Sequence, residues 1–373
     1  SALKPFLYAA AFDSGALTAG TVVEDRAAVF GARAPANFDG RFRGEVTVGE
    51  ALALSLNIPA YRIAQELGAG RFLAVLRESG LATLDAGAGH YGLALALGGC
   101  EVRLWDLVGA YGVFATGGRP VVPHLLPRCG GGPPGRQVFS AEACWLVNEA
   151  LSGTSGTAAA AGPRIAWKTG TSSGMRDAWC VAWNPGFVVG VWLGNADGRG
   201  DEALVGAGAA APLAMRVFRQ AAAGVGPDHW FQRPDGLVSM DVCARSGREA
   251  AEGCAARVGD WRIAGVTLRR GCDRCGTEMR TGLTAASDRP VIVQPLRDTV
   301  LRRNEWMGEE TVVPLQSAAG PGGRVFWFVN GEPAGEASRG ETLVWRPRGV
   351  TGRVVVTCAA ASAASDQVMF RIE

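Results

Sequence analysis

A serine and a lysine stand three residues apart at the start of the chain, in Ser1-Ala2-Leu3-Lys4. Residues three apart on a helix share one face, so the lysine amine can reach the serine hydroxyl. A serine hydroxyl becomes a nucleophile when a base takes its proton, and lysine can be that base where burial and a nearby positive charge depress its pKa. The pair indicates covalent serine catalysis, although the spacing alone is also typical of an ordinary helix start.

A second motif contains the other lysine of the chain. Of 37 basic residues only Lys4 and Lys168 are lysines, and lysine, unlike arginine, can give up a proton. Lys168 opens Lys168-Thr169-Gly170-Thr171, which is predicted to lie on a strand. Gly170 would let a substrate backbone lie close, while Lys168, Thr169 and Thr171 would bind a carboxylate. Lys168 would also supply the charge that lowers the pKa of Lys4.

A third motif, Ser55-Leu56-Asn57, lies between the other two in the sequence. Its hydroxyl can pass a proton between a lysine and a leaving group, and its amide can hold a substrate amide. Taken singly, Ser-x-Asn is a common helix end and a K-T-G-T strand is an ordinary sheet edge. The three motifs in this order, with both lysines at motif positions, form a much more specific signal.

The order S-x-x-K, S-x-N and K-T-G resembles the signature of penicillin-binding proteins and serine β-lactamases. The surrounding sequence extends the likeness to the transpeptidase domain of bifunctional class A penicillin-binding proteins. From Val291 onward the chain resembles the C-terminal β domain of the 1C type. The stretches that resemble the transpeptidase domain are residues 1–8, 50–60, 91–99 and 176–179.

This resemblance implies D,D-transpeptidation of peptidoglycan stem peptides and acylation by β-lactam antibiotics. Ser1 would attack the D-Ala-D-Ala carbonyl, Lys4 would be the general base, and Ser55 would relay the proton to the departing D-alanine. The oxyanion would lie between the backbone N–H groups of Ser1 and Thr171. No cofactor or metal is expected in the reaction. The residues implied to bind substrate are Asn57, Lys168, Thr169, Gly170 and Thr171.

The family also has strands, a glycosyltransferase domain and a membrane anchor upstream of the serine. Because Ser1 falls in what should be the first turn of a helix, we expect residue 1 to be the boundary of a piece of a longer protein. The parent protein would be anchored in the bacterial inner membrane with this part on the periplasmic side. Activity of a chain that begins at Ser1 is expected to be impaired, since its backbone N–H is an amine there.

The elements that must position these motifs are helices followed by strands. Residues 1 to about 160 have mainly helical spacing, with Thr47 and Glu50 fitting a capping box before a short helix that Pro59 should end or bend near Asn57. Short strands are predicted at 165–169, 178–183 and 187–193, and a covering helix at 212–222. The fold class predicted is α+β, a penicillin-binding or serine β-lactamase-like transpeptidase fold without its first strands.

A small β-sandwich domain is predicted after this part. The strand-like runs there lie at 291–294, 311–315, 324–329, 342–345, 353–358 and 367–372, and Asn330-Gly331 is a hairpin signal. The predicted domain limits are 1–235 for the transpeptidase part, 236–289 for a cysteine-containing linker or stapled segment, and 290–373 for the β domain.

Four of the nine cysteines lie in the middle segment, at Cys243, Cys254, Cys272 and Cys275. Their spacing differs from the paired C-x2-C of a zinc ribbon, and no histidine lies nearby. We therefore favour disulfides over reduced cysteines, and reduced cysteines over zinc.

Other classes of function remain as alternatives. A D,D-carboxypeptidase or β-lactamase-like hydrolase would share the motifs but pass the acyl group to water. A Ser1 activated by its own α-amine would leave Lys4 and the K-T-G-T strand unexplained. A catalytically inert module could bind peptide or partner proteins through the same surfaces. A net charge of +2 with no basic stripe argues against nucleic acid as a partner.

Overall fold

The computed structural model divides the chain into two units. The first comprises Ser1–Asp25 and Arg43–Thr277, and the second comprises Arg26–Phe42 and Glu278–Glu373. No helix among the described residues is long and apolar enough to cross a membrane. The structure describes residues 1–26, 28, 35–125, 135–152, 164–223, 230–275, 290–295, 300–301, 312–318, 323–347, 349–360 and 365–372.

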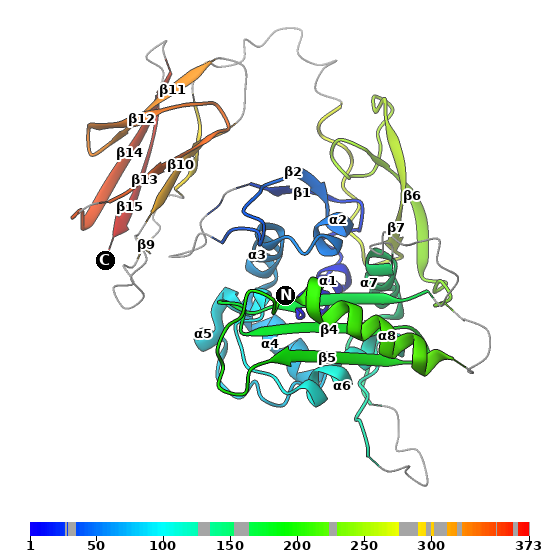
Figure 1. Ribbon diagram of the computed structural model, residues 1–373. Coiled ribbons are helices and arrows are strands. Elements are labelled where there is room, and N and C mark those ends of the chain that lie inside the picture. Colours follow the sequence, from blue (N-terminus) through cyan, green and yellow to red (C-terminus); the bar gives the residue numbers. More distant parts are fainter. Residues whose placement is uncertain are drawn as a thin grey trace. The chain divides into compact units, whose positions relative to one another are not determined.

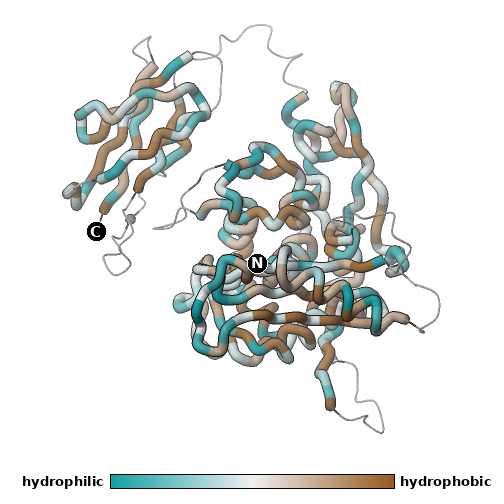
Figure 2. Tube along the Cα trace, in the orientation of Figure 1, coloured by the Kyte–Doolittle hydropathy of each residue, from teal (hydrophilic) through white to brown (hydrophobic). Residues whose placement is uncertain are grey.

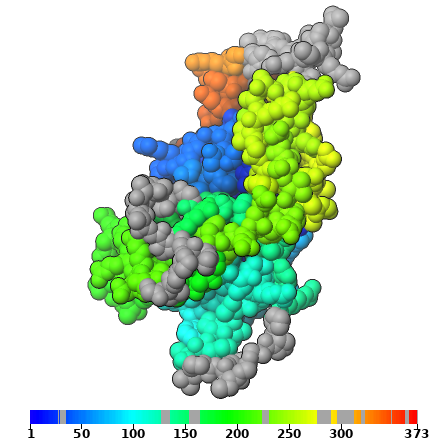
Figure 3. Space-filling view, turned by 90° about the vertical axis from the view of Figure 1, so that its right-hand side faces the viewer, coloured from blue at the N-terminus to red at the C-terminus, as the bar shows by residue number. Residues whose placement is uncertain are grey.

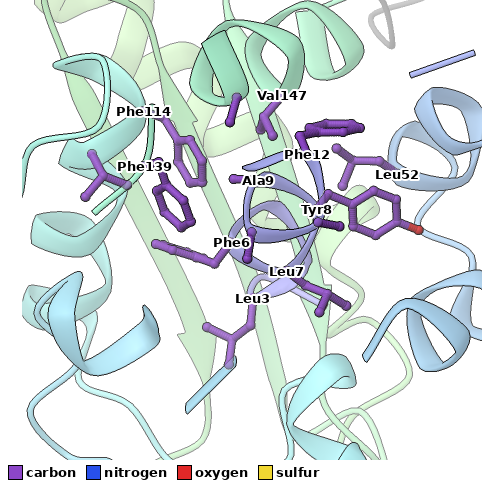
Figure 4. Close-up of a cluster of buried hydrophobic side chains, with 14 of the residues drawn as sticks. Leu3, Phe6, Leu7, Tyr8, Ala9, Phe12, Leu52, Phe114, Phe139 and Val147 are labelled. Atoms are coloured by element: carbon purple, nitrogen blue, oxygen red, sulfur yellow. The ribbon is translucent and has the colours of Figure 1, made fainter. Parts of the chain in front are cut away.

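The helices that precede the sheet in the first unit surround one central helix, α1 (Lys4–Asp13). Residues 4–12 of α1 are all buried, so this helix has no polar face. Figure 4 shows its side chains pointing outward on every side into neighbouring helices. The Phe6 ring packs edge-on against Tyr111 and close to Phe114. The other helices are α2 (Val48–Ala53), α3 (Asn57–Leu67), α4 (Ala69–Glu78), α5 (Ala88–Tyr91), α6 (Leu104–Ala115) and α7 (Ala141–Ser152), with a 3₁₀-helical turn at Gly92–Leu97.

A three-stranded antiparallel sheet follows, in the order β3 (Ala166–Thr171), β4 (Asp177–Trp183) and β5 (Val188–Gly194). Both β4 and β5 are mostly hydrophobic (Figure 2), and β4 has buried residues on both faces. Helix α8 (Ala211–Ala222) packs on one face through small residues such as Ala214. Trp183 on the other face joins the core around α1. The predicted succession of helices, meander and covering helix is confirmed.

One local prediction differs from the structure, and one hairpin was not predicted. The capping box of Thr47 and Glu50 is present, but α2 already ends at Ala53. A new helix, α3, begins at Asn57, and Pro59 lies in its first turn, where a missing N–H costs nothing. The sequence also gave no sign of the hairpin formed by β1 (Val22–Asp25) and β2 (Gly44–Thr47).

A second unexpected hairpin lies in the segment that showed no periodicity. Strands β6 (Leu237–Cys243) and β7 (Arg257–Ile263) pair antiparallel, with Cys243 opposite Arg257. The hairpin packs against the start of the chain, where the backbone N–H of Gly20 donates to Asp260 Oδ2 at 2.9 Å. Figure 3 shows this yellow-green region directly against blue residues from the N-terminal part. Residues 276–289, the end of the predicted middle segment, lie outside the described residues.

The second unit contains two antiparallel sheets that share one core. Strands β13, β10 and β8 form one sheet, and β12, β11, β14 and β15 form the other, with the short β9 parallel to β15. Buried residues of both, such as Leu315 and Trp327, meet in that core, as expected for a sandwich. The strands are β8 (Ile292–Gln294), β9 (Val300–Leu301), β10 (Val313–Ser317), β11 (Arg324–Val329), β12 (Glu332–Ser338), β13 (Thr342–Trp345), β14 (Gly352–Ala360) and β15 (Ser365–Ile372).

The turn predicted at Asn330-Gly331 is present, and both residues have positive φ, at 50° and 85°. It joins β11 to β12, a strand that was not among the predicted runs. We did not predict β12 from the sequence, because Pro333 and Gly335 interrupt its mostly exposed, polar residues.

Two buried hydrogen bonds made by the Asn148 side chain connect the sheet to the helices. Trp183 Nε1 donates to Asn148 Oδ1 at 2.8 Å, and Asn148 Nδ2 donates to the carbonyl oxygen of Phe114 at 3.1 Å. Asn148→Ala would leave both buried partners unpaired, so we expect the free energy of unfolding to fall by about 2 to 4 kcal/mol. Urea denaturation measures this loss. The control Asn195→Ala, at an exposed loop, should change it by less than about 0.5 kcal/mol, and equal effects would contradict the predicted role of these hydrogen bonds.

Candidate active site

Ser1 and Lys4 lie one turn apart at the start of α1. Pro5 is tolerated there because the first turn has no internal partners for its N–H groups. Lys4 Nζ donates to Ser1 Oγ at 3.1 Å, which is the contact predicted from the spacing. The lysine side chain is completely buried, so its amine is held in place by neighbours rather than by water.

The amine of Lys4 has three further acceptors, on Ser55 between α2 and α3 and on Asn57 at the start of α3. It donates to the Ser55 carbonyl oxygen at 2.6 Å, to Ser55 Oγ at 3.3 Å and to Asn57 Oδ1 at 2.7 Å. Burial lowers the pKa of Lys4 well below its ordinary value, and the charge of Lys168 lowers it further, against an opposing effect of Asp25. A neutral amine beside a serine hydroxyl can act as a general base.

Ser55 adopts an uncommon backbone conformation with φ of 57°. A non-glycine residue in this left-handed region is strained, and such residues concentrate at functional sites. The break between α2 and α3 places both the carbonyl oxygen and the hydroxyl of Ser55 against Lys4. This local strain is therefore part of what brings the second motif to the first.

Lys168 reaches the same hydroxyl from the sheet. In β3 the residues alternate between buried and half-buried, and Lys168 is on the buried side with Ala166 and Gly170. Its Nζ donates to Ser55 Oγ at 2.7 Å and to the Thr169 carbonyl oxygen at 2.9 Å. Burial lowers the pKa of Lys168 to about 7, opposed by the nearby Cys180. Ser55 Oγ thus lies between two buried amines.

The remaining predicted residues lie along β3. Thr169 and Thr171 are half-buried on the strand face opposite Lys168. Thr171 Oγ1 accepts a hydrogen bond from the backbone N–H of Gly206 at 2.9 Å. A Cβ added to Gly170 would lie 3.3 Å from the backbone nitrogen of Ala2, so glycine lets β3 approach the start of α1.

A cavity of about 200 Å³ opens beside Ser1. Its lining includes Gly98, Thr171, Asp177 and Trp179. The Ser1 nitrogen donates to the Leu97 carbonyl oxygen at 2.6 Å. Burial lowers the pKa of this amine well below its ordinary value, and the charges of both lysines add to the effect.

All three motifs therefore meet, because hydrogen bonds connect Ser1, Lys4, Ser55, Asn57 and Lys168 in one network. Asn57 Oδ1 accepts a hydrogen bond from the Lys4 amine, a contact that was not predicted. Sequence reasoning did not assign roles to Leu97 and Gly98 beside Ser1. The Tyr91 to Gly99 stretch was noticed for its resemblance, which was the available signal for them.

The lowered pKa of the buried Lys168 predicts how the free energy of unfolding depends on pH. The pKa of Lys168 is about 7 in the folded chain against an ordinary 10.5, so between these values the unfolded chain holds a proton that the folded chain has released. Stability conferred by this group therefore rises with pH across that window, by about 1.4 kcal/mol per pH unit for one proton. Unfolding in urea at about pH 7 and about pH 8.5 should show a smaller rise in Lys168→Met than in the unsubstituted chain. An equal rise in both would contradict the lowered pKa.

Comparisons with known proteins agree with this geometry. The family model "Penicillin binding protein transpeptidase domain" matches residues 1–215, and "Penicillin-Binding Protein C-terminus Family" matches residues 280–370. Penicillin-binding protein 1C of Escherichia coli is 29% identical over 92% of this chain and 52% of its own length. Penicillin-binding protein 1A of Neisseria cinerea is 30% identical over 65% of this chain and 33% of its own. The chain thus spans about half or less of these curated relatives.

Solved structures show the same fold. The crystal structure of penicillin-binding protein 1A from Haemophilus influenzae has a TM-score of 0.63 at 22% identity, over 73% of this chain and 48% of the other. PonA1 of Mycobacterium tuberculosis in complex with penicillin V has a TM-score of 0.56 at 22% identity, over 63% of this chain and 72% of that one. The predicted fold class and family resemblance are confirmed. The chain belongs to the penicillin-binding protein transpeptidase domain family and continues into a penicillin-binding protein C-terminal domain.

Proposed function

We propose that this chain is the peptidoglycan D,D-transpeptidase part of a class A penicillin-binding protein. The observation that carries the proposal is the 3.1 Å contact between Ser1 Oγ and a completely buried Lys4 amine, beside a second buried lysine. A nucleophile, a neutral base and a nearby cation are the parts that serine acyl transfer needs. Acyl transfer by a serine and a lysine needs no cofactor.

In the acylation step, Ser1 Oγ bonds to the carbonyl carbon of the penultimate D-alanine of a stem peptide. The bond from that carbon to the nitrogen of the terminal D-alanine then breaks. The proton of the hydroxyl passes to Lys4 and then through Ser55 to the departing amine. This relay is supported by the position of Ser55 Oγ, 3.3 Å from one amine and 2.7 Å from the other.

Substrate binding is assigned to β3 and to the second motif. Lys168, Thr169 and Thr171 would hold the terminal carboxylate, and the glycine between the threonines would let the peptide lie along the strand edge. Asn57 would orient the donor peptide through its side-chain amide. The backbone N–H groups of Ser1 and Thr171 would stabilise the oxyanion.

In the second step an acceptor amine attacks the ester carbon, the Ser1 oxygen leaves, and Lys4 moves the amine proton back to it. The product is an amide cross-link, whereas attack by water would give a carboxypeptidase. We place the parent protein at the periplasmic side of the bacterial inner membrane, with a glycosyltransferase domain and an anchor upstream. Relatives about twice as long as the chain support this arrangement.

The test uses a stem peptide that ends in D-Ala-D-Ala, with and without an acceptor amine. It compares this chain with a version extended upstream, since the extension would turn the Ser1 nitrogen into an amide. Mass spectrometry of the products should show acceptor-dependent release of D-alanine together with a cross-linked peptide from the extended protein. Release without acceptor would identify a hydrolase. Absence of both reactions would favour the inert binding module.

A further inference from the structure

The four cysteines of the segment after the transpeptidase core converge on one point. Their Sγ atoms all lie within 4.8 Å of one another, and those of Cys243 and Cys275 are 3.5 Å apart. All four are free cysteines, so the disulfides that we favoured from the sequence are not formed. Cys243 and Cys254 are buried, while Cys272 and Cys275 are half-buried.

Backbone hydrogen bonds bring these cysteines together, although their spacing in the sequence did not predict this. Cys243 ends β6, and its N–H donates to the carbonyl oxygen of Arg248 at 2.8 Å. The N–H of Cys272 donates to the carbonyl oxygen of Glu249, also at 2.8 Å. Residues 248 and 249 therefore lie between two cysteine-bearing segments that are 29 positions apart in the chain. Cys254 approaches from the loop that joins β6 to β7.

The chain turns tightly after Cys243. The N–H of Ser246 donates to the Cys243 carbonyl oxygen at 3.2 Å. The turn closes with the N–H of Gly247 donating to the Cys243 carbonyl oxygen at 2.8 Å. Gly247 has φ of 63°, and a Cβ there would lie 2.1 Å from the carbonyl oxygen of Gly20. Only glycine therefore fits this turn.

Arg274, which lies between Cys272 and Cys275, donates from Nη1 to the carbonyl oxygen of Arg245 at 2.9 Å and so connects this segment to the turn after Cys243. The N–H of Ala251 donates to Cys254 Sγ at 3.3 Å. Backbone donors of this kind stabilise thiolates and orient them as ligands.

We propose that Cys243, Cys254, Cys272 and Cys275 form a structural zinc site. Zinc binds thiolate sulfur at about 2.3 Å in tetrahedral geometry, which places the sulfurs about 3.8 Å apart. The cluster has the number, softness and spacing of ligands for such a site. Four protein ligands leave no open position, so the ion would be structural and not catalytic.

The zinc site would stabilise the packing of the β6–β7 hairpin against the transpeptidase core next to α1. Beyond β7 the N–H of Leu268 donates to the carbonyl oxygen of Gly15 at 2.9 Å, two residues after α1 ends. Trp261 of β7 packs edge-on against Trp145 of α7. Loss of zinc should therefore loosen contacts with the helix that carries Ser1 and Lys4.

The test is the metal content of the full chain, purified without chelators and measured by inductively coupled plasma mass spectrometry. About one zinc ion per chain is expected, falling below about one in ten chains in the double variant Cys272→Ala/Cys275→Ala. The matched control is Cys358→Ala, which removes a buried cysteine of β14 in the other unit. It should keep its zinc.

A second measurement, on the unsubstituted chain, does not depend on the folding of any variant. In denaturant with EDTA and no reductant, all four cysteines should react with iodoacetamide, as seen by peptide mass spectrometry. Four cysteines that react only after reduction would mean two disulfides and would overturn the proposal. A chain that contains no metal, or stoichiometric iron instead of zinc, would overturn it as well.

Discussion

Lys4→Met is expected to slow acylation by fluorescent penicillin by about 10²- to 10⁴-fold, the usual loss when a general base is removed. Methionine has a similar length but cannot take the Ser1 proton. The amine of Lys4 is buried at a pKa well below its ordinary value, so the folded state already disfavours its charge. The rate is read as labelled protein on denaturing gels over time, in the upstream-extended chain.

Folding provides the control for this variant. Replacing a completely buried amine by an apolar side chain removes a desolvation cost but also removes the donor to the Ser55 carbonyl oxygen and Asn57 Oδ1. Because these two effects oppose each other, the thermal midpoint should change little. A Lys4→Met protein that is acylated slowly and is also destabilised would indicate a structural role for Lys4. Acylation at the normal rate would show that another group takes the serine proton.

Lys168→Met should lower the acylation rate constant by about 10- to 100-fold, the value of a charge-assisted hydrogen bond to a carboxylate. Its effect on pH dependence is more specific. With a pKa of about 7, Lys168 loses its charge above neutral pH, so the rate in the unsubstituted chain should decline there. The decline should be absent from Lys168→Met.

The rising part of the profile of acylation rate against pH should also shift, to higher pH. The charge of Lys168 helps to lower the pKa of Lys4, so without it that pKa rises and the base becomes active only at higher pH. Arg199→Met removes an exposed cation paired with Asp197. It should change neither the rising nor the falling part of the pH–rate profile. A profile of Lys168→Met that is scaled down but unshifted would contradict electrostatic coupling between the two lysines.

The site could be predicted from the sequence to the extent that its parts are local. Ser1 and Lys4 are one helical turn apart, and Lys168 to Thr171 follow strand alternation, so spacing alone predicts which side chains share a face. The capping box of Thr47 and Glu50 is a local signal of the same kind. The position of Ser55 Oγ between the two lysine amines was not predicted, because no local pattern links positions 55 and 168.

What the sequence could not predict depends on long-range contacts. The α2–α3 break is set by the strained Ser55 and not by Pro59, and strain of this kind is held in place by tertiary packing. The cysteine cluster needs the pairing of residues 248–249 with two distant segments. Strand β12 has polar, exposed residues because it is an edge strand, and polarity alone resembles a loop.

The central claim is that the hydroxyl of Ser1 forms the acyl-enzyme, and mass spectrometry of the acylated protein tests it most directly. The upstream-extended chain and the chain that begins at Ser1 are each treated with several β-lactams and digested. The account predicts an adduct of the whole drug on the peptide that contains Ser1, cleaved by hydroxylamine as an ester is, and absent from Ser1→Ala. An adduct on another residue, a hydroxylamine-resistant amide on the Ser1 amine alone, or no adduct with any drug would contradict it.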